Sequence, residues 1–411
     1  MLKDIDKELY NALICEQEKQ RDTIGLIPSE NIVSRNVLKL MGSIFTNKYA
    51  EGYPGKRYYG GCRFVDEVER LAIKRSCMLF GAEHSNVQPH SGSQANMAAY
   101  FSVLKPGDKI LAMDMLAGGH LTHGLKVNFS GIFYQSVFYN VDRDTETIDY
   151  DRVREIALKE KPKMIICGAS SYSRIIDFQR FYSIAREVNA YLLADIAHIA
   201  GLVVANLHPS PVHLADFVTS TTHKTLRGPR GGLVLCKQEY SNKLDSSIIP
   251  GIQGGPLMHI IAAKALAFKE AMSPDFFKYQ KQIIKNCKRL CEEFKNRNYR
   301  IVSGGTDNHL FVIDLRNKGI TGDEYEKLLE DVGIITNKNL IPYDPHPPSI
   351  TSGLRIGTPL ITSRGMKEDD MTLIADWMDE TLKNRENKKV LKDIAKKVRR
   401  FAREFPIYPS S

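Results

Sequence analysis

Segments with helical and strand patterns alternate through the first two thirds of the chain, and this alternation limits the fold more than any other feature. A helical pattern followed by an apolar run occurs at residues 150–170 and again at 177–198, and a turn followed by a strand is predicted at 105–113. Two further strands are predicted at 216–221 and 231–237. Such alternation is typical of a mostly parallel sheet that helices cover on both faces.

The alternation of helical and strand patterns ends after residue 257. Long helices are predicted at 258–272 and 276–297, and shorter strands and helices follow to the end. We expect three parts: an N-terminal helix or arm (1–20), a large domain (21–279) and a smaller C-terminal α+β domain (280–411).

Composition indicates an ordinary globular protein, with 43% hydrophobic and 26% charged residues among 411. No apolar run approaches the roughly 20 residues that a membrane span needs, and the N-terminus does not resemble a signal peptide. The seven cysteines are scattered without a C-x-x-C pair. We therefore expect a cytoplasmic protein with reduced thiols and no membrane partner.

The formal net charge of +9 raises the alternative of a nucleic-acid-binding protein. Much of the excess lies in residues 383–405, where Val390, Leu391, Ile394, Val398 and Phe401 recur at helical spacing among lysines and arginines. This pattern favours a solvated amphipathic helix, and no recognition motif accompanies it. Nucleic acid is therefore not the expected partner, although salt-sensitive RNA binding would support that alternative.

Three polar features point to chemistry at the strand ends. Asp195 closes the apolar strand YLLAD, and an acid there needs a cationic partner to offset desolvation. Lys224 follows a strand in the stretch TTHKTLRGPRGG, and Ser91-Gly92-Ser93 precedes a helix, where backbone N–H groups can hold a phosphate. A phosphate cradle, an acid for a ring nitrogen and a lysine able to form an imine are what pyridoxal phosphate requires.

Longer stretches resemble the serine hydroxymethyltransferase family. They are NKYAEGYPGKRYYGG (47–61), NVQPHSGSQAN (86–96), GGHLTHG (118–124), DIAHIAGLV (195–203), TTHKTLRGPRGG (221–232), QGGPLMH (253–259), VSGGTDNHL (302–310) and TSGLRIGTP (351–359). The resemblance implies a fold-type I pyridoxal-phosphate enzyme with a mostly parallel seven-stranded sheet in its large domain. It also implies interconversion of serine and glycine, with tetrahydrofolate exchanging the one-carbon unit.

The resemblance implies that Lys224 carries the cofactor as an imine, flanked by His223 and Thr221. Asp195 is implied to hold a proton on the pyridine nitrogen. The other cofactor residues are implied to be Ser91, Gly92 and Ser93 at the phosphate, His120 on the ring, His198 and Ser170 near its phenolic oxygen, Arg230 on the loop after the lysine, and Gly254 and Gly255 from the neighbouring subunit. No metal ion is implied.

For the substrates, the resemblance implies that Arg355 binds the amino-acid carboxylate and that Glu51 exchanges a proton during one-carbon transfer. The loop that carries Glu51 is implied to enter the active site of the partner in a homodimer. The remaining residues implied to contact serine or the folate are Ser29, Tyr49, Tyr58, Tyr59, Gly119, Leu121 and Asn339.

The sequence leaves several alternatives open. A folate-independent pyridoxal-phosphate aldolase acting on 3-hydroxy amino acids, similar to threonine aldolases, is the second interpretation. Ile249 and Met115 depart from familiar versions of the family near the folate, so the identity and affinity of the pterin stay open. Whether dimers pair into tetramers, and which direction the flux takes, also stay open.

Overall fold

The computed structural model describes residues 2–408 and divides the chain into two compact units. Residues 33–281 form one, here called the sheet unit, and residues 1–32 with 282–411 form the other, here called the terminal unit. The predicted large domain begins at residue 21 instead. Residues 24–25 form strand β1 (Ile24–Gly25), which pairs in parallel with β13 (Ile334–Ile335) and so ties this segment to the terminal unit.

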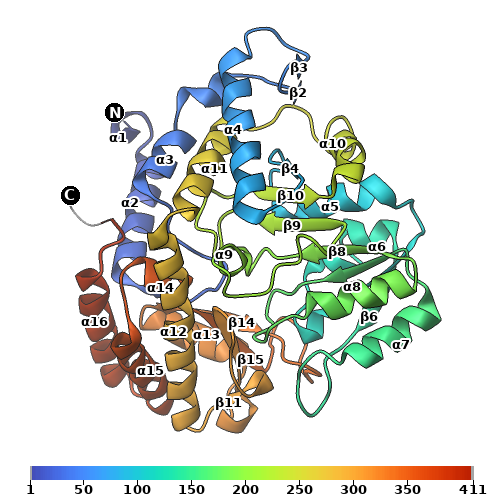
Figure 1. Cartoon of the computed structure of the whole chain (residues 1–411). Helices are drawn as coiled ribbons and strands as arrows, with labels where there is room; N and C mark the ends of the chain where they lie inside the picture. The colour runs from blue at the N-terminus through green and yellow to red at the C-terminus, as the bar shows by residue number, and fades with distance from the viewer. Residues whose placement is uncertain (1, 409–411) are drawn as a thin grey trace. The chain divides into compact units, whose positions relative to one another are not determined.

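A seven-stranded sheet with the order β4-β10-β9-β8-β7-β5-β6 forms the centre of the sheet unit (Figure 1). The pairs β5–β6, β5–β7, β7–β8 and β8–β9 are parallel, whereas β10 runs antiparallel to β9 and β4. This confirms the predicted mostly parallel sheet. The strands are β4 (His84–Asn86), β5 (Lys109–Met113), β6 (Gln135–Tyr139), β7 (Met164–Cys167), β8 (Tyr191–Asp195), β9 (Phe217–Thr221) and β10 (Gly232–Cys236).

Every residue of β7, β9 and β10 is buried, because elements pack on both faces of the sheet. This double burial explains why β7 and β10 are continuous apolar runs. In β9 the hydroxyl residues Thr219, Ser220 and Thr221 are buried as well. The helices of the sheet unit are α3 (Arg35–Met41), α4 (Arg63–Phe80), α5 (Gly92–Val103), α6 (Phe129–Phe133), α7 (Tyr150–Glu160), α8 (Phe178–Glu187), α9 (Ala200–Val204), α10 (Ser241–Ile248) and α11 (Met258–Ala271).

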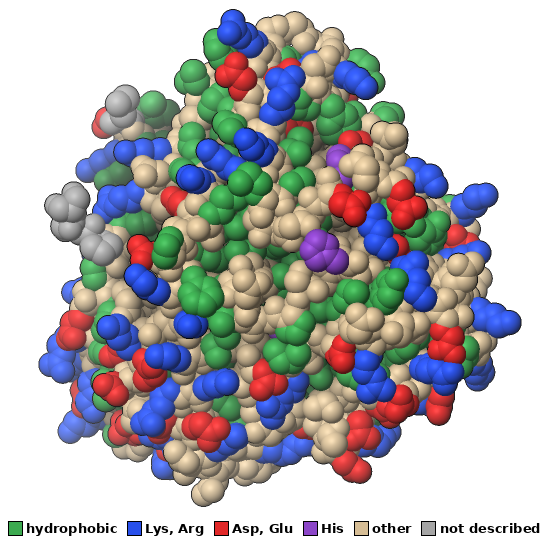
Figure 2. Space-filling model, in the orientation of Figure 1, with side chains coloured by type: hydrophobic (Ala, Val, Ile, Leu, Met, Phe, Trp, Pro, Cys, Tyr) green, Lys and Arg blue, Asp and Glu red, His purple; other side chains and the backbone are tan. Residues whose placement is uncertain are grey.

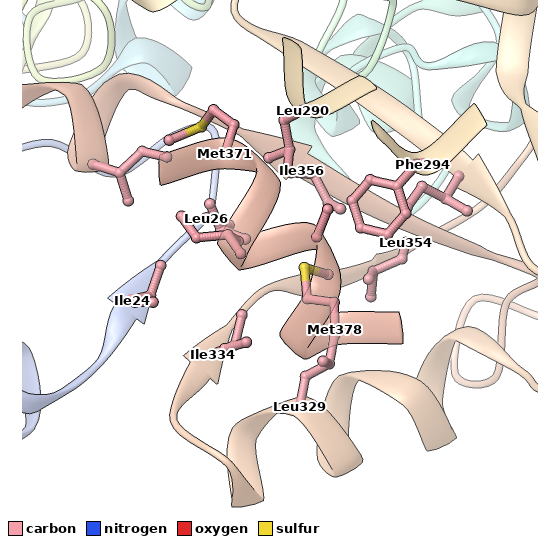
Figure 3. Close-up of a cluster of buried hydrophobic side chains, with 14 of the residues drawn as sticks. Ile24, Leu26, Leu290, Phe294, Leu329, Ile334, Leu354, Ile356, Met371 and Met378 are labelled. Atoms are coloured by element: carbon pink, nitrogen blue, oxygen red, sulfur yellow. The ribbon is translucent and has the colours of Figure 1, made fainter. Parts of the chain in front are cut away.

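The terminal unit holds a four-stranded antiparallel sheet with the order β11-β12-β15-β14. Its strands are β11 (Arg300–Ile301), β12 (Leu310–Asp314), β14 (Asn337–Asn339) and β15 (Gly353–Gly357), and its helices are α1 (Leu2–Ile5), α2 (Lys7–Asp22), α12 (Pro274–Asn296, whose first turns lie in the sheet unit), α13 (Gly322–Asp331), α14 (Pro359–Ser363), α15 (Glu368–Lys383) and α16 (Lys388–Glu404). Leu26, Phe294, Ile356 and Met378 meet in its core, which Figure 3 shows.

The C-terminal helix α16 is amphipathic, as the sequence predicts. Ile394, Val398 and Phe401 are buried in the core of the terminal unit, and the lysines and arginines of the helix are exposed. Among residues 2–408, no helix combines the length and the apolar character that crossing a lipid bilayer requires.

One buried arginine joins the ends of two helices in the terminal unit. The Arg364 guanidinium donates hydrogen bonds to the carbonyls of Gln20, Arg21 and Thr23 at the end of α2, at 3.2, 3.0 and 2.6 Å. It also donates to the carbonyls of Ala402 and Phe405 at the end of α16. Carbonyls in the last turn of a helix lack partners within that helix, so one cation satisfies two helix ends.

We expect the substitution Arg364→Met to lower the free energy of unfolding by about 3 kcal/mol or more, because several buried carbonyls lose their donor. Calorimetry should show a lower melting temperature, and amide exchange should accelerate at the ends of α2 and α16. Arg385→Met is the matched control, because Arg385 is exposed and its bond to the Gly319 carbonyl is long, at 3.5 Å. Equal melting temperatures for both variants would contradict the assignment.

Candidate functional site

The Asp195 carboxylate at the carboxyl end of β8 is the centre of a hydrogen-bond network. Its Oδ2 accepts hydrogen bonds from His123 Nε2 at 3.0 Å and from Asn96 Nδ2 at 2.9 Å, and its Oδ1 accepts one from the Ala197 amide at 3.0 Å. Asn96 in turn accepts a bond from Thr219 Oγ1 on the adjacent strand β9, at 2.6 Å. The network therefore fixes an acid at the edge where the parallel strands end.

Two opposing effects act on the pKa of Asp195. Burial alone would raise the pKa of this carboxyl, but the hydrogen bond and charge of His123, the charge of His120 and the bond from Asn96 together hold it well below its ordinary value. Asp195 is thus a carboxylate at neutral pH. An ionised acid in a buried position can hold a proton on a neighbouring basic nitrogen.

Lys224 lies three residues beyond the end of β9 and is only 8% exposed. Hydroxyl groups on both sides of it bind the segment that follows Asp195. Thr221 Oγ1 donates to the Ala197 carbonyl at 3.3 Å, and Thr225 Oγ1 donates to the His198 carbonyl at 2.8 Å. These bonds bring the segments that carry Lys224 and His198 together.

The Ser91–Ser93 segment forms the N-terminus of α5. Ser91 is the N-cap residue, and its hydroxyl accepts a hydrogen bond from the Gln94 amide at 3.3 Å. A Cβ atom on Gly92 would lie 2.7 Å from the Thr221 methyl group, so glycine allows this helix start to approach the end of β9. The free N–H groups and the positive end of α5 suit an anion.

A third segment, which follows β5, carries Gly119, His120 and Leu121. His120 Nδ1 lies 2.6 Å from Thr122 Oγ1, and its ring meets the His123 ring edge to face at 5.6 Å. The Ser170 amide donates to the Gly118 carbonyl at 2.7 Å, which joins this segment to the one that follows β7. The predicted residues His120, Ser170, Asp195 and Lys224 thus lie on neighbouring segments at one edge of the sheet.

His223 precedes Lys224 and is half-buried. Burial lowers the pKa of its imidazole to about 3, with further lowering by the positive charges of Arg230 and Lys224. Its Nδ1 atom is buried without a hydrogen-bond partner among the described residues. The imidazole is therefore neutral at neutral pH, and its Nδ1 is available as a hydrogen-bond acceptor. Arg230 is exposed on the loop that follows.

We expect the His223 imidazole to stay neutral from pH 9 down to pH 5, because burial and nearby cations disfavour its charged form. NMR of protein labelled at the histidine rings should show no titration of the His223 signals in this range, with His223→Asn giving the assignment. Acidification below the ordinary histidine pKa of about 6.5 should favour unfolding, since the unfolded chain then binds the proton more tightly. A titration midpoint near 6.5 in the folded protein would contradict this.

The predicted substrate loop at residues 49–59 is fixed by a buried arginine. The Arg57 guanidinium donates to the carbonyls of Ala50 and Gly52, both at 2.7 Å, and to the Asp66 carboxylate at 2.8 Å. It also pairs with Glu69, whose side chain is 1% exposed. The two carbonyls flank Glu51, so this clamp holds the backbone on either side of the predicted acid.

Tyr49, Glu51 and Tyr59 lie together beside Gly254 and Gly255. The rings of Tyr49 and Tyr59 meet edge to face at 5.0 Å, and Tyr59 OH lies 3.5 Å from Glu51 Oε2. A Cβ on Gly255 would lie 2.8 Å from the Tyr49 ring, and one on Gly254 would lie 3.4 Å from Glu51 Oε1. These residues form a second group, and its tyrosines are exposed: Tyr49 56%, Tyr58 73% and Tyr59 47%.

Three predicted substrate residues belong to the terminal unit. Arg355 lies in β15, where its Nε donates to Asn337 Oδ1 at 3.2 Å, and burial lowers the pKa of Arg355 to about 10. The Gly357 amide at the end of β15 donates to the Leu26 carbonyl at 2.8 Å, which places the segment of Ser29 beside this strand. Asn339 lies opposite Gly353 in β14.

Sequence reasoning did not select Asn96, Thr122 or His123, although they complete the Asp195 network. The ligand atoms of His120, His123 and Asp195 all lie within 4.8 Å of one another, a spacing that a metal ion could also use. The sequence predicts no metal here, and His123 and Asn96 act as hydrogen-bond donors to the Asp195 oxygen. The signal that could have found these residues is their place inside the quoted motifs GGHLTHG and NVQPHSGSQAN.

Ile249, a departure noted near the predicted folate site, is only 5% exposed and packs with Leu244 and Ile248 in the core of the sheet unit.

A family model described as serine hydroxymethyltransferase matches residues 2–378 of the 411. The matched range includes every residue selected above as a candidate for cofactor or substrate binding.

Proposed function

Because the chain belongs to the serine hydroxymethyltransferase family of enzymes, which interconvert serine and glycine with transfer of a one-carbon unit, we propose that it works with pyridoxal phosphate held at Lys224. We further propose that tetrahydrofolate is the one-carbon carrier. The observation that carries the cofactor proposal is the ionised Asp195 at the end of β8, with Lys224 and the α5 N-terminus on neighbouring segments.

The residues present fit the cofactor group by group. The N–H groups at the start of α5 and the Ser91 and Ser93 hydroxyls suit a phosphate, and Gly92 lets this helix start lie against Thr221 beside the Lys224 segment. Asp195 suits a protonated pyridine nitrogen, since it is ionised and its side chain is only 11% exposed. His120 would cover the ring, and Ser170 and His198 would lie near its phenolic oxygen.

When bound, pyridoxal phosphate supplies a ring that withdraws electrons from the substrate α-carbon. Asp195 would keep a proton on the ring nitrogen and so strengthen that withdrawal. The neutral His223 imidazole offers Nδ1, which has no hydrogen-bond partner within the described residues, as a hydrogen-bond acceptor. Lys224, flanked by Thr221, would hold the cofactor between turnovers.

For the substrates, we propose that Arg355 binds the carboxylate of serine or glycine, because its planar fork suits a bidentate carboxylate contact. Ser29 would assist it. We propose that Glu51 exchanges a proton with the one-carbon fragment and the pterin nitrogens. The folate would be bound by Tyr58, Gly119, Leu121 and Asn339, and Tyr49 and Tyr59 would line the carboxylate site.

We also propose a homodimer in which the loop at residues 49–59 and Gly254–Gly255 serve the active site of the partner. Exposed apolar side chains support a covered surface on each unit. Phe64, Leu71 and Met78 recur every seven residues along α4 and are 65%, 44% and 65% exposed. Figure 2 shows hydrophobic side chains on the face that carries α4. In the terminal unit, Leu9 and Leu13 of α2 are 57% and 46% exposed.

Borohydride reduction of the cofactor-loaded protein should attach a pyridoxyl group to Lys224, because a lysine bound to the cofactor as an imine is fixed by reduction. Peptide mass mapping reads the position directly. Lys224→Arg should take up no label under the same conditions. A label on any other lysine, Lys264 included, would contradict the assignment of Lys224 as the cofactor-binding lysine.

Glu51→Gln separates the folate-dependent reaction from the aldolase alternative. The amide keeps the shape of the side chain but cannot carry a proton, so serine cleavage with tetrahydrofolate should fall about 10²- to 10⁴-fold. Folate-free cleavage of allo-threonine and cofactor binding should change by no more than a few-fold. The matched control is Glu155→Gln, an acid on α7 whose side chain is 63% exposed and which lies outside both the loop and the α4 surface. Equal losses in both reactions would make Glu51 a general binding residue.

A further inference from the structure

Lys264, in the middle of α11, is a buried cation that none of the roles above uses. Its side chain is 1% exposed, and its Nζ donates hydrogen bonds to three backbone carbonyls: Val87 at 2.7 Å, Pro89 at 3.0 Å and Gly232 at 2.8 Å. A neutral amine has only two N–H groups, so all three bonds require the ammonium form.

The three carbonyls belong to two segments. One leads to Ser91–Ser93, here called the phosphate cradle, and the other follows the loop that carries Lys224. Val87 and Pro89 lie between β4 and Ser91, and Gly232 is the first residue of β10, after the Lys224 loop. The Gly232 amide also donates to the Pro89 carbonyl, at 3.0 Å. Lys264 therefore joins the segment that precedes α5 to the first residue of β10, which follows the Lys224 loop.

Gln253 holds the same segment from another side. Its Oε1 accepts a bond from the His90 amide at 3.1 Å, and its Nε2 donates to the Gln88 carbonyl at 3.0 Å. The carbonyls of residues 87, 88 and 89 and the amide of residue 90 are thus each bound by a side chain of Lys264 or Gln253. This stretch has no regular strand or helix to fix it, so these two side chains, together with the bond from the Gly232 amide to Pro89, help to fix where Ser91 and Gly92 lie.

The lysine stem is closely packed. A Cβ on Gly231 would lie 2.5 Å from Lys264 Cε and 3.1 Å from its Nζ, and a Cβ on Gly232 would lie 2.2 Å from the Ser91 carbonyl oxygen. The two glycines after Arg230 therefore let the lysine and the cradle approach this closely.

The charge of Lys264 acts on its surroundings as well. Burial lowers the pKa of Lys264 to about 7, and the negative charge of Glu69 opposes this. The three carbonyl acceptors further favour the charged form. The pKa of His90, next to Ser91, is lowered by burial and by the positive charge of Lys264. The field of this cation therefore reaches the residue that precedes the cradle.

We propose that Lys264 is a positioning residue for phosphate binding: its ammonium fixes the backbone before Ser91 and adds a buried positive charge behind the N-terminus of α5. Placement of N–H donors within about 0.5 Å decides how well they bind an anion. A positive charge in a buried, weakly polar setting attracts a phosphate more strongly than one in water. This inference rests on the proposal that the α5 N-terminus holds the cofactor phosphate.

The test compares a ligand that carries the phosphate with one that lacks it. Apoprotein of the wild type and of Lys264→Met is titrated with pyridoxal phosphate and with pyridoxal. Methionine keeps most of the stem but loses the charge and the donors. We expect the dissociation constant for pyridoxal phosphate to rise about 10- to 100-fold, and that for pyridoxal to change less than about three-fold. Stabilisation of the apoprotein by inorganic phosphate in a thermal melt should be lost in parallel.

Arg364→Met is the matched control, because Arg364 is also a buried cation whose hydrogen bonds to five carbonyls are described above, but it lies in the terminal unit. It should lower the melting temperature and leave the ratio of the two dissociation constants unchanged. Equal weakening of both ligands by Lys264→Met, or no weakening of either, would overturn the proposal.

Gln253→Leu provides a second variant in case Lys264→Met does not fold. It removes two neutral hydrogen bonds from the same segment and no charge, so the preference for the phosphorylated ligand should fall by less, about three- to ten-fold. An unchanged preference would overturn the positioning role. Borohydride labelling of Lys224 in the wild type tests the cofactor proposal separately, so a wrong cofactor and a wrong role for Lys264 give different results.

Discussion

A buried carboxylate must be compensated wherever it lies, and the compensation of Asp195 organises the functional edge of the sheet. Its partners come from α5, from the segment after β5 and from the backbone beyond β8, so each must end at the same place for the acid to stay ionised. The bond from Thr219 to Asn96 extends this requirement to β9, the strand that precedes Lys224. The electrostatic state of one side chain thus depends on the correct packing of several elements.

In both units, buried cations satisfy backbone carbonyls, as the donors around Asp195 satisfy its carboxylate. Arg57, Lys264 and Arg364 each donate to backbone carbonyls in places where regular secondary structure is short or ends: the loop that carries Glu51, the entrance to α5 and two helix ends. Irregular backbone is otherwise costly to bury, because each unpaired carbonyl loses its hydrogen bond to water. A single long cationic side chain can satisfy several such groups and fix their relative positions, which suits segments that must present a ligand site.

The sequence predicts the apolar strands and the polar residues that stand beside them. It does not reveal polar residues that are buried inside helices, because their neighbours in the sequence look ordinary. The predicted strands β7, β8 and β10 are mainly apolar, and β9 combines Phe and Val with β-branched or hydroxyl residues. By contrast, β4 is the polar tripeptide HSN and β6 is an edge strand with two exposed residues, so neither has a clear period. Asp195 and Lys224 stand out beside apolar strands. Asn96 lies 99 residues from its partner Asp195, and Lys264 stands in AAKALAFK as any solvent-facing helix lysine would. Only the fold reveals that these positions are buried.

The close packing of Gly231 on the Lys264 stem means that these two sites cannot change independently over evolutionary time. An alanine at 231 would collide with the lysine, while a shorter residue at 264 would leave a void and unbound carbonyls unless another donor took its place. Any lineage that replaced the lysine would therefore have to acquire a compensating group first or at the same step. The fitness effect of a mutation at one site depends on the residue at the other, which is epistasis with a direct steric origin.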